Sequence, residues 1–349
     1  MAPNRAGQRG IHYGGVVGID ADGDRVDGSL RLVGGVLELT LPAAFVDGAD
    51  YPLVLDPLVG TTLAIDDSGN ADSNPSLASA DAGGTMAVWE RRFSASHIEL
   101  VGHRISTTTG VLSGSLIPIC VGDDVIAENP SVAYIRGGTA WLAAYEYRTH
   151  PNLSPRIYVS SFRQHYDVEG PVALSPSAFP QRTPSVGGDG TGTDDEGFVV
   201  WREDGVGVRG RTVTTEDDEL PLPTGTAFTV ASDQIGNQAL HPKVSDMAND
   251  RPDLLVVWEL DLANSMKSLV YGRFYNRDGV ALTDDFVLYK NFDQFYGHYA
   301  PAVAGEGERF VVAWERSESI GGSVVRDIVA RMIDWDGSNI DFSDQQFIA

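Results

Sequence analysis

The sequence predicts an all-β protein, a β-propeller of about five four-stranded blades that follows a small antiparallel β module. Three observations predict this fold. A unit of 56 or 57 residues recurs five times, each unit contains four β-rich runs, and no segment shows a convincing 3.6-residue apolar period. Glycine supplies 39 of the 349 residues, above its usual share of ~7%, as tight turns between many short strands require.

The composition excludes several classes of function. The chain has 25 Lys and Arg against 49 Asp and Glu, a net charge of −24, so nucleic-acid binding is not expected. The single cysteine, Cys120, precludes an internal disulfide or a cysteine-based zinc site. No window approaches the ~18 apolar residues of a spanning helix, so no membrane insertion is expected. The polar start has no signal-peptide core, which leaves either a cytosolic chain or a start that has been cut away.

Residues 1–60 form the predicted β module. Alternating apolar runs are separated by Asp-Gly turns, as in antiparallel hairpins. Asp20, Asp22 and Asp24 alternate as the first ligands of a calcium loop do, so they are a candidate Ca²⁺ site. However, Arg25 and Arg31 occupy the positions of the required glycine and glutamate, so a hairpin turn is the favoured interpretation.

The repeat fills residues 61–349, the predicted propeller domain. Each unit opens with a proline and continues into an apolar run that ends in an aromatic residue followed by a glutamate. Position +3 after each proline is small, as expected for the innermost strands, which converge on the axis. The aromatic residue one strand further out is suited to packing between sheets. The predicted blades cover residues 75–120, 130–175, 184–231, 242–290 and 301–349, with aromatic residues Trp89, Tyr145, Trp201, Trp258 and Trp314.

The number of blades is left open by the sequence. A stretch before the first unit, Thr62-Leu-Ala-Ile-Asp66, resembles a sixth copy of the closing strand. Either five blades close with a spare strand, or the chain stops before a further blade.

Two segments carry a resemblance. The stretch from Ile19 through Tyr51-Pro-Leu-Val-Leu-Asp-Pro57 resembles the β module that precedes repeat domains in large bacterial secreted and surface proteins. The P-x-V-A…VVWE…GR…G units are similar to the propeller-like repeats of those proteins. The resemblance implies an extracellular or cell-surface location and a place within a larger surface protein. It implies no catalytic residue, because those families are largely uncharacterised.

The repeated glutamates are candidate ligand-binding residues, because the symmetry of a propeller would gather them on one rim. The favoured alternative is structural, with each glutamate paired to an arginine of the third strand or capping a loop. The residues are Glu90, Glu146, Glu203, Glu259 and Glu315.

An aromatic insertion between residues 289 and 299 is the second candidate binding site. Its exposed rings could stack on sugars or anchor a partner protein, although packing between blades would also explain them. The candidate residues are Phe292, Phe295, Tyr296, His298 and Tyr299.

Two functions follow from these features. The main prediction is a non-catalytic binding or scaffold module that meets a glycan or protein ligand on the propeller face, with no cofactor other than Ca²⁺. The alternative is a carbohydrate-active enzyme of the glycoside hydrolase kind, which needs two carboxyl groups in the central funnel. Acids that follow the first strand of a unit could supply them, although turn chemistry also explains these residues: Asp81, Asp189, Asp246 and Glu306.

Overall fold

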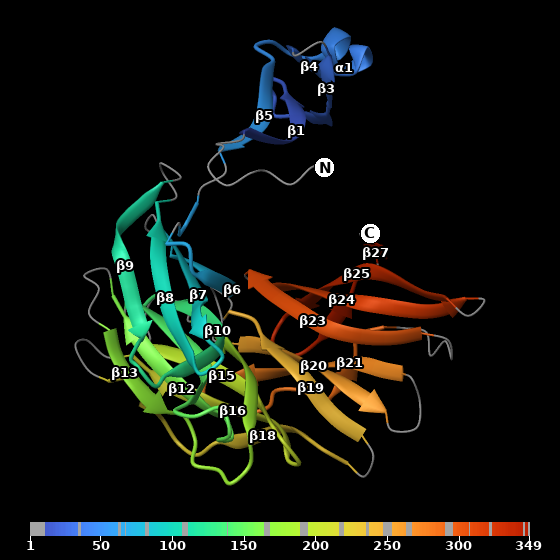
Figure 1. Cartoon of the computed structure of the whole chain (residues 1–349). Helices are drawn as coiled ribbons and strands as arrows, with labels where there is room; N and C mark the ends of the chain where they lie inside the picture. Colours follow the sequence, from blue (N-terminus) through green and yellow to red (C-terminus); the bar gives the residue numbers. More distant parts are fainter. Residues whose placement is uncertain are drawn as a thin grey trace. The chain divides into compact units, whose positions relative to one another are not determined.

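The computed structural model divides the chain into two compact units, residues 1–67 and 68–349 (Figure 1). Each unit is considered by itself. The structure describes residues 11–347 except 34–35, 62–63, 67, 81–83, 107–110, 138, 164–167, 189–194, 216–219, 235–236, 247–252, 263–266, 290–295, 307, 321–322 and 345.

The first unit is a small antiparallel β module. Its main sheet has the strand order β2-β1-β5, formed by β1 (Ile11–Ile19), β2 (Arg25–Asp27) and β5 (Val54–Thr61). A hairpin of β3 (Ser29–Val33) and β4 (Val36–Thr40) precedes the short helix α1 (Ala43–Gly48). Among the described residues, no helix has the length and apolar character needed to cross a membrane.

The second unit contains five groups of antiparallel strands, named here sheets 1 to 5. Sheet 1 comprises β6 (Ala71–Ala80), β7 (Gly84–Ser94), β8 (His97–Ile105) and β9 (Leu112–Cys120). Sheet 2 comprises β10 (Ile126–Ile135), β11 (Ala140–Arg148), β12 (Arg156–Phe162) and β13 (Val168–Ala173). Sheet 3 comprises β14 (Gln181–Gly187), β15 (Glu196–Glu203), β16 (Gly207–Thr214), β17 (Leu222–Pro223) and β18 (Phe228–Ser232).

The last two sheets follow the same order. Sheet 4 comprises β19 (Asn237–Val244), β20 (Asp253–Leu262), β21 (Lys267–Asn276) and β22 (Phe286–Val287). Sheet 5 comprises β23 (Tyr296–Glu306), β24 (Arg309–Ile320), β25 (Ser323–Trp335), β26 (Ile340–Phe342) and β27 (Gln346–Phe347). The prediction of an all-β chain with many sheets is therefore confirmed.

The first strands of the sheets contact one another in series. Strand β6 contacts β10, β10 contacts β14, β14 contacts β19, and β19 contacts β23 (Figure 1). Sheets 1 and 2 are also joined by one parallel pair, Ile98 with Ile126. We call these five first strands the inner strands.

The repeated aromatic side chains pack between sheets. From sheet 2 onward, each lies in a buried cluster with side chains of the preceding sheet, which explains why the period holds over the whole unit. Their exposed fractions are 0–2% from Tyr145 to Trp314. Each of these inter-sheet clusters therefore contains one aromatic residue that the repeat places at the same position.

Each inner strand has a β-bulge at its proline. The residue before the proline adopts a left-handed conformation in every sheet, although none of the five is glycine. The φ angles are 48° at Asn74, 53° at Asn129, 48° at Thr183, 48° at His241 and 46° at Ala300. Non-glycine residues pay a conformational cost here, so the surrounding contacts must hold them.

Candidate functional site

The repeated glutamates connect neighbouring sheets. Glu90, Glu146, Glu203 and Glu259 are 0–7% exposed, so their carboxylates are not surface groups. At three junctions the carboxylate accepts a hydrogen bond from the left-handed residue of the next inner strand. These bonds are Asn129 N to Glu90 Oε1 at 2.7 Å, Thr183 N to Glu146 Oε1 at 2.9 Å, and Ala300 N to Glu259 Oε2 at 3.1 Å.

The partners of Glu203 and Glu315 are of two kinds, and that of Glu315 is a third-strand arginine, as the structural alternative predicted. Glu203 accepts a bond from Ser177 Oγ at 2.7 Å. Glu315 is partly exposed and pairs with Arg326, at 3.2 Å. The third-strand arginines Arg211 and Arg331 donate instead to main-chain carbonyls. Glu90, Glu146 and Glu259 therefore bind the next sheet, whereas Glu315 pairs with an arginine on the third strand of its own sheet. As candidate ligand-binding residues the glutamates stay a prediction.

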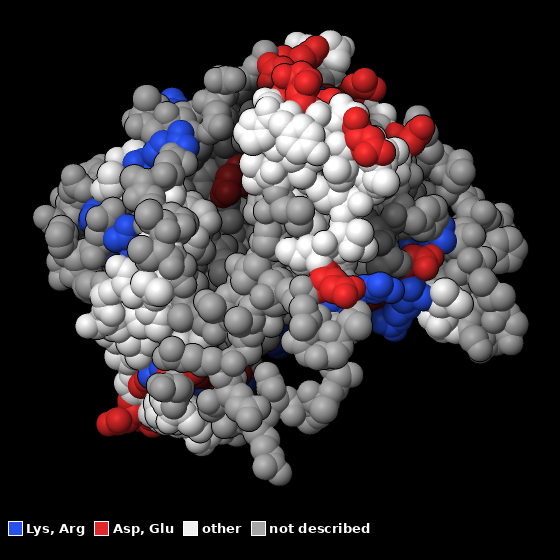
Figure 2. Space-filling model, turned by 90° about the horizontal axis from the view of Figure 1, so that it is seen from above, with Lys and Arg blue, Asp and Glu red and all other residues white. Residues whose placement is uncertain are grey.

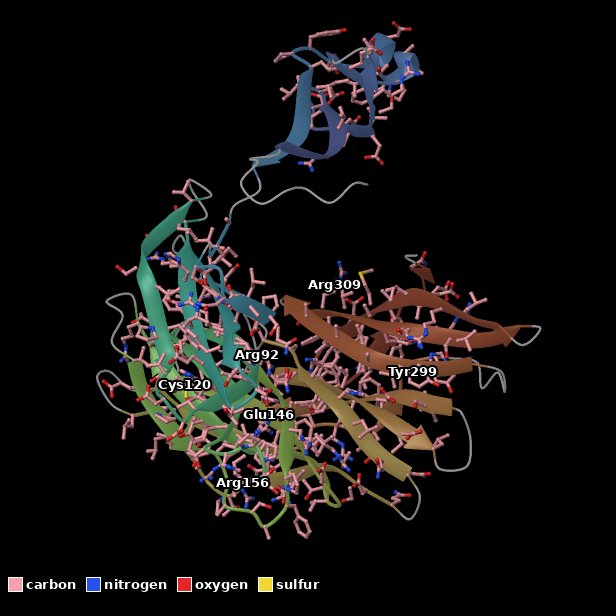
Figure 3. All side chains as sticks on the ribbon, viewed as in Figure 1. Arg92, Cys120, Glu146, Arg156, Tyr299 and Arg309 are labelled. Atoms are coloured by element: carbon pink, nitrogen blue, oxygen red, sulfur yellow. The ribbon has the colours of Figure 1, made fainter. Side chains whose placement is uncertain are left out.

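Two equivalent glutamates have pKa shifts of opposite sign. Burial raises the pKa of Glu146, and bonds from Thr183 and Asn129 only partly offset it. Burial also acts to raise the pKa of Glu259, but hydrogen bonds from His241, Ala300 and Ser268 outweigh it and lower the pKa overall. In Figure 3 the label of Glu146 lies near the middle of the second unit, close to that of Arg92.

Serines after the proline connect the inner strands of sheets 1 to 4. Each serine Oγ accepts a bond from a valine N–H of the next inner strand: Val132 N to Ser76 at 3.1 Å, Val186 N to Ser131 at 3.0 Å, and Val244 N to Ser185 at 3.2 Å. In sheets 4 and 5 this position is Lys243 and Ala302. Neither side chain can accept such a bond, so the repeated pattern of bonds ends at sheet 4.

Strand β19 therefore differs from the other inner strands. Three ionisable residues on it and just beyond its end are exposed, His241, Lys243 and Asp246. At the corresponding positions of sheet 3, Ser185 and Gly188 are buried and Thr183 is half-buried. We take these three residues, with their partners, as the candidate functional site.

His241 is held by a buried carboxylate. Its Nδ1 lies 2.9 Å from Glu259 Oε2, and its side chain is 51% exposed while that of Glu259 is 5% exposed. A carboxylate that accepts the Nδ1 proton fixes the tautomer and leaves Nε2 for another partner. The other four residues at this position, two asparagines, a threonine and an alanine, have no ionisable side chain.

Asp246 lies beside a close approach of three inner strands, β10, β14 and β19. Its Oδ1 accepts a bond from Gly188 N at 2.7 Å. A Cβ on Gly188 would lie 2.1 Å from the Tyr134 carbonyl oxygen, and one on Gly187 would lie 2.2 Å from that of Ser245. Burial raises the pKa of Asp246, even though the Gly188 bond acts to lower it. Asp246 is thus exposed to water, while the protein atoms around it disfavour the charged form of its carboxyl.

Lys243 shows the same combination. The residue is exposed to water, yet desolvation lowers the pKa of its ammonium group. Sequence reasoning missed Lys243 and His241 as site residues. The signal was present, since both depart from the Ser and Asn or Thr found at these positions in sheets 1 to 3.

The aromatic insertion is only partly described. Phe292 and Phe295 lie outside the described residues, and Tyr296 is described only as the start of β23. His298 is buried, accepts a bond from Trp314 Nε1 at 2.8 Å, and stacks on Tyr289. Burial, with a smaller effect of Arg316, lowers the pKa of His298 to about 4. The described part thus packs inward at His298, while a binding role for the insertion stays a prediction.

The predicted calcium loop has the geometry of a turn. Asp20 Oδ1 accepts bonds from Asp22 N at 3.1 Å and Asp24 N at 2.8 Å, and Gly23 has a φ of 87°. Across the described residues, no group of three or more His, Cys, Asp or Glu side chains could hold a metal ion. Calcium binding stays a prediction.

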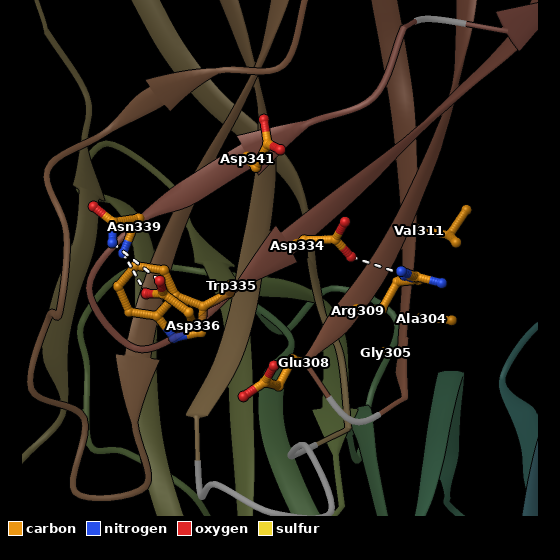
Figure 4. Close-up of a pocket in the computed structure, with 10 residues that line it drawn as sticks. All are labelled: Ala304, Gly305, Glu308, Arg309, Val311, Asp334, Trp335, Asp336, Asn339 and Asp341. Carbon is orange, nitrogen blue, oxygen red and sulfur yellow. Dashed lines mark hydrogen bonds and ion pairs between the residues drawn. The ribbon is translucent and has the colours of Figure 1, made fainter.

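A pocket of about 880 Å³ lies at the end of sheet 5 (Figure 4). Four acids line it, but Asp334 pairs with Arg309 at 2.8 Å, and Asp336 accepts bonds from the turn that follows it. On the face shown in Figure 2, the described Lys and Arg occur in small groups, several of them beside acids. Neither feature provides a binding chemistry comparable to that of β19.

The chain was compared with known proteins. No family model and no curated protein matches it. Solved structures do match. An α-L-arabinanase from Penicillium chrysogenum has a TM-score of 0.49 and 12% identity, covering 80% of this chain and 95% of that one. A GH43 endo-arabinanase from Bacillus licheniformis has a TM-score of 0.40 and 11% identity, and the match covers 79% of this chain and 98% of that one. An α-L-arabinofuranosidase from Podospora anserina has a TM-score of 0.43 and 10% identity, and the match covers 80% of this chain and 93% of that one.

These matches correct the main functional prediction. These structures are named as arabinanases and an arabinofuranosidase, and two further matches are named as glycosyl or glycoside hydrolases, so the prediction of a non-catalytic binding or scaffold module is not retained. The alternative, a carbohydrate-active enzyme, agrees with them. At these identities and TM-scores the likeness assigns no reaction to this chain, so the case for one rests on its own residues.

Proposed function

We propose that sheets 1 to 5 are the blades of a five-bladed propeller whose inner strands surround a central funnel. The serial contacts of the inner strands and the packing of each aromatic residue on the preceding sheet support this arrangement. The protein is then a carbohydrate-active enzyme of the glycoside hydrolase kind, and its reaction takes place in that funnel.

Asp246 is the single observation that carries the proposal. Glycoside hydrolysis needs a carboxylic acid that keeps its proton long enough to protonate the leaving oxygen. Asp246 combines a pKa raised by burial with exposure to water, so its carboxyl can hold a proton and still meet a ligand. Its bond from Gly188 N fixes one oxygen and leaves the other to act as the acid.

The candidate for the second carboxyl group is Glu306, whose side chain lies outside the described ones. It ends β23, the inner strand next to β19, as Asp246 follows β19 itself. Glycosidases place their two carboxyl groups ~5–10 Å apart. Acids at the ends of two adjacent inner strands meet the requirement that the pair come from different sheets.

The test is hydrolysis of a panel of aryl glycosides and plant or fungal polysaccharides by the full chain. Asp246→Asn is expected to lower kcat by about 10²-fold or more, since proton transfer of this kind contributes that much. The asparagine oxygen can still accept the Gly188 bond, so folding should be preserved. Asp278→Asn, an exposed acid in a turn of sheet 4, is the matched control and should leave kcat unchanged.

The pH profile gives a second readout. Because burial raises the pKa of Asp246, the wild-type rate should fall only as pH rises through that raised value. Absence of hydrolysis on every substrate, or equal rates for Asp246→Asn and the wild type, would refute the proposal. The extracellular location stays a prediction.

A further inference from the structure

Lys243 is an unusual cation in this molecule. It is one of three lysines in a chain of net charge −24, and it lies on an inner strand. Arginines of the same unit form ion pairs: Arg92 with Glu128 at 3.3 Å, Arg182 with Asp204 at 3.4 Å, and Arg202 with Asp233 at 2.6 Å. Among the described residues, Lys243 has no such partner.

The surroundings of Lys243 make the lack of an ion-pair partner energetically unfavourable. Protein atoms desolvate its ammonium group enough to lower its pKa. A desolvated charge is unfavourable unless an opposite charge or hydrogen-bond acceptors compensate it. A partner from outside the chain would supply the missing compensation.

Comparison with the other repeats shows that a hydrogen bond between inner strands is lost where Lys243 replaces serine. In sheets 1 to 3 the same position is a serine that accepts a bond from the next inner strand. Lysine has three donors and no acceptor, so the bond from β23 is lost at this junction. A local departure from a repeated structural rule is expected where function requires it.

We infer that Lys243 binds the carboxylate of an acidic sugar unit, which makes uronate-containing glycans the substrate class of the proposed site. This inference rests on the proposed function. A carboxylate suits the single ammonium group, which acts as a point charge with three donors. The equivalent residue of the adjacent strand, Ala302, carries only a methyl group, so it takes up less room than the serines elsewhere.

The net negative charge of the chain makes the binding of an acidic glycan depend on a local cation such as Lys243. A protein with a net charge of −24 repels anionic ligands at long range. An acidic glycan can therefore bind only where a local cation outweighs that repulsion. Asp246, the proposed acid, lies three residues further along the chain, just beyond the end of β19.

The experiment measures binding by calorimetry with the full chain at low ionic strength. The probes are digalacturonate, the neutral disaccharide of the same linkage, and inorganic phosphate. Lys243→Met keeps the length of the side chain and removes its charge. Lys267→Met, on the third strand of the same sheet, removes one positive charge elsewhere and is the matched control.

The expected result is that digalacturonate binds more tightly than the neutral disaccharide. Lys243→Met should weaken digalacturonate binding about tenfold or more, because bonds to charged groups contribute that much, and Lys267→Met should not. Equal affinity for acidic and neutral sugars, or equal loss in both variants, would overturn the inference.

Two further outcomes separate this inference from the proposed function. If phosphate binds through Lys243 but no sugar does, the site is a general anion site, and the assignment to acidic sugars is overturned. If the protein hydrolyses neutral glycans and this activity depends on Asp246, but no anion binds, the proposed function is supported and the inference about Lys243 is overturned.

Discussion

Strands β14 and β19 occupy equivalent places in the repeat, yet they use their side chains differently. On β14, Thr183 N donates a hydrogen bond to Glu146, and Ser185 Oγ accepts one from Val244 N of the next inner strand. On β19 the corresponding residues are His241 and Lys243, which are exposed. The comparison shows that at these positions β14 bonds its neighbours, while β19 carries ionisable groups and makes one bond fewer to the next inner strand.

The largest expected effect tests whether the core between sheets, rather than the inner strands, holds sheet 4. Trp258 is 2% exposed and packs with residues of sheet 3. Trp258→Ala should lower the free energy of unfolding by about 3–5 kcal/mol, measured by urea denaturation. Leu282→Ala, at a residue that is 39% exposed, should change it far less. Similar losses in both variants would contradict this role of the aromatic residue.

The second prediction concerns the close approach of β14 to its neighbours. In Gly188→Ala the new Cβ would lie 2.1 Å from a main-chain oxygen, which cannot rotate away. We expect a loss of about 1–3 kcal/mol in unfolding free energy, together with reduced hydrolysis, since the donor to Asp246 must move. Gly48→Ala is the control, because a Cβ there meets nothing within 4 Å. An unchanged melting temperature for Gly188→Ala would show that the strands can separate here.

The third prediction uses the two glutamates with opposite pKa shifts. For Glu146, whose pKa is raised in the fold, stability decreases as pH rises from the unfolded value of 4.5 through the folded one. For Glu259, whose pKa is lowered, stability is present above 4.5 and is lost as pH falls through the folded value.

Thermal melting between pH 3 and 8 checks the signs. The difference in stability between wild type and Glu146→Gln should move in favour of Glu146→Gln as pH rises above 4.5. The difference for Glu259→Gln should narrow as pH falls below 4.5. Parallel pH curves for the two variants would show that the glutamates have the same environment, contrary to the structure.

Much of the scaffold could be predicted from the sequence. The period of the aromatic residues gave five groups of strands, since a buried ring is needed once per sheet. The partners of the glutamates could not be predicted, because they depend on left-handed backbone at residues such as Asn129 and Thr183. A residue before proline is ordinarily extended, so sequence rules point away from this conformation. Lys243 was readable as a departure from the repeat, but its lack of a partner required the structure.

The smallest expected effect bears most directly on the comparison of the two strands. Lys243→Ser restores the residue that β14 has at this position, and its Oγ could accept a bond from Val303 N, the counterpart of Val244 N. A hydrogen bond of this kind contributes about 0.5–1.5 kcal/mol, and removal of a desolvated charge adds to it. We therefore expect Lys243→Ser to unfold at higher urea concentration than wild type while it loses preference for the acidic sugar. A stability equal to or below that of wild type would mean that Lys243 costs the scaffold nothing, and the contrast between β14 and β19 would then reflect drift in the repeat rather than function.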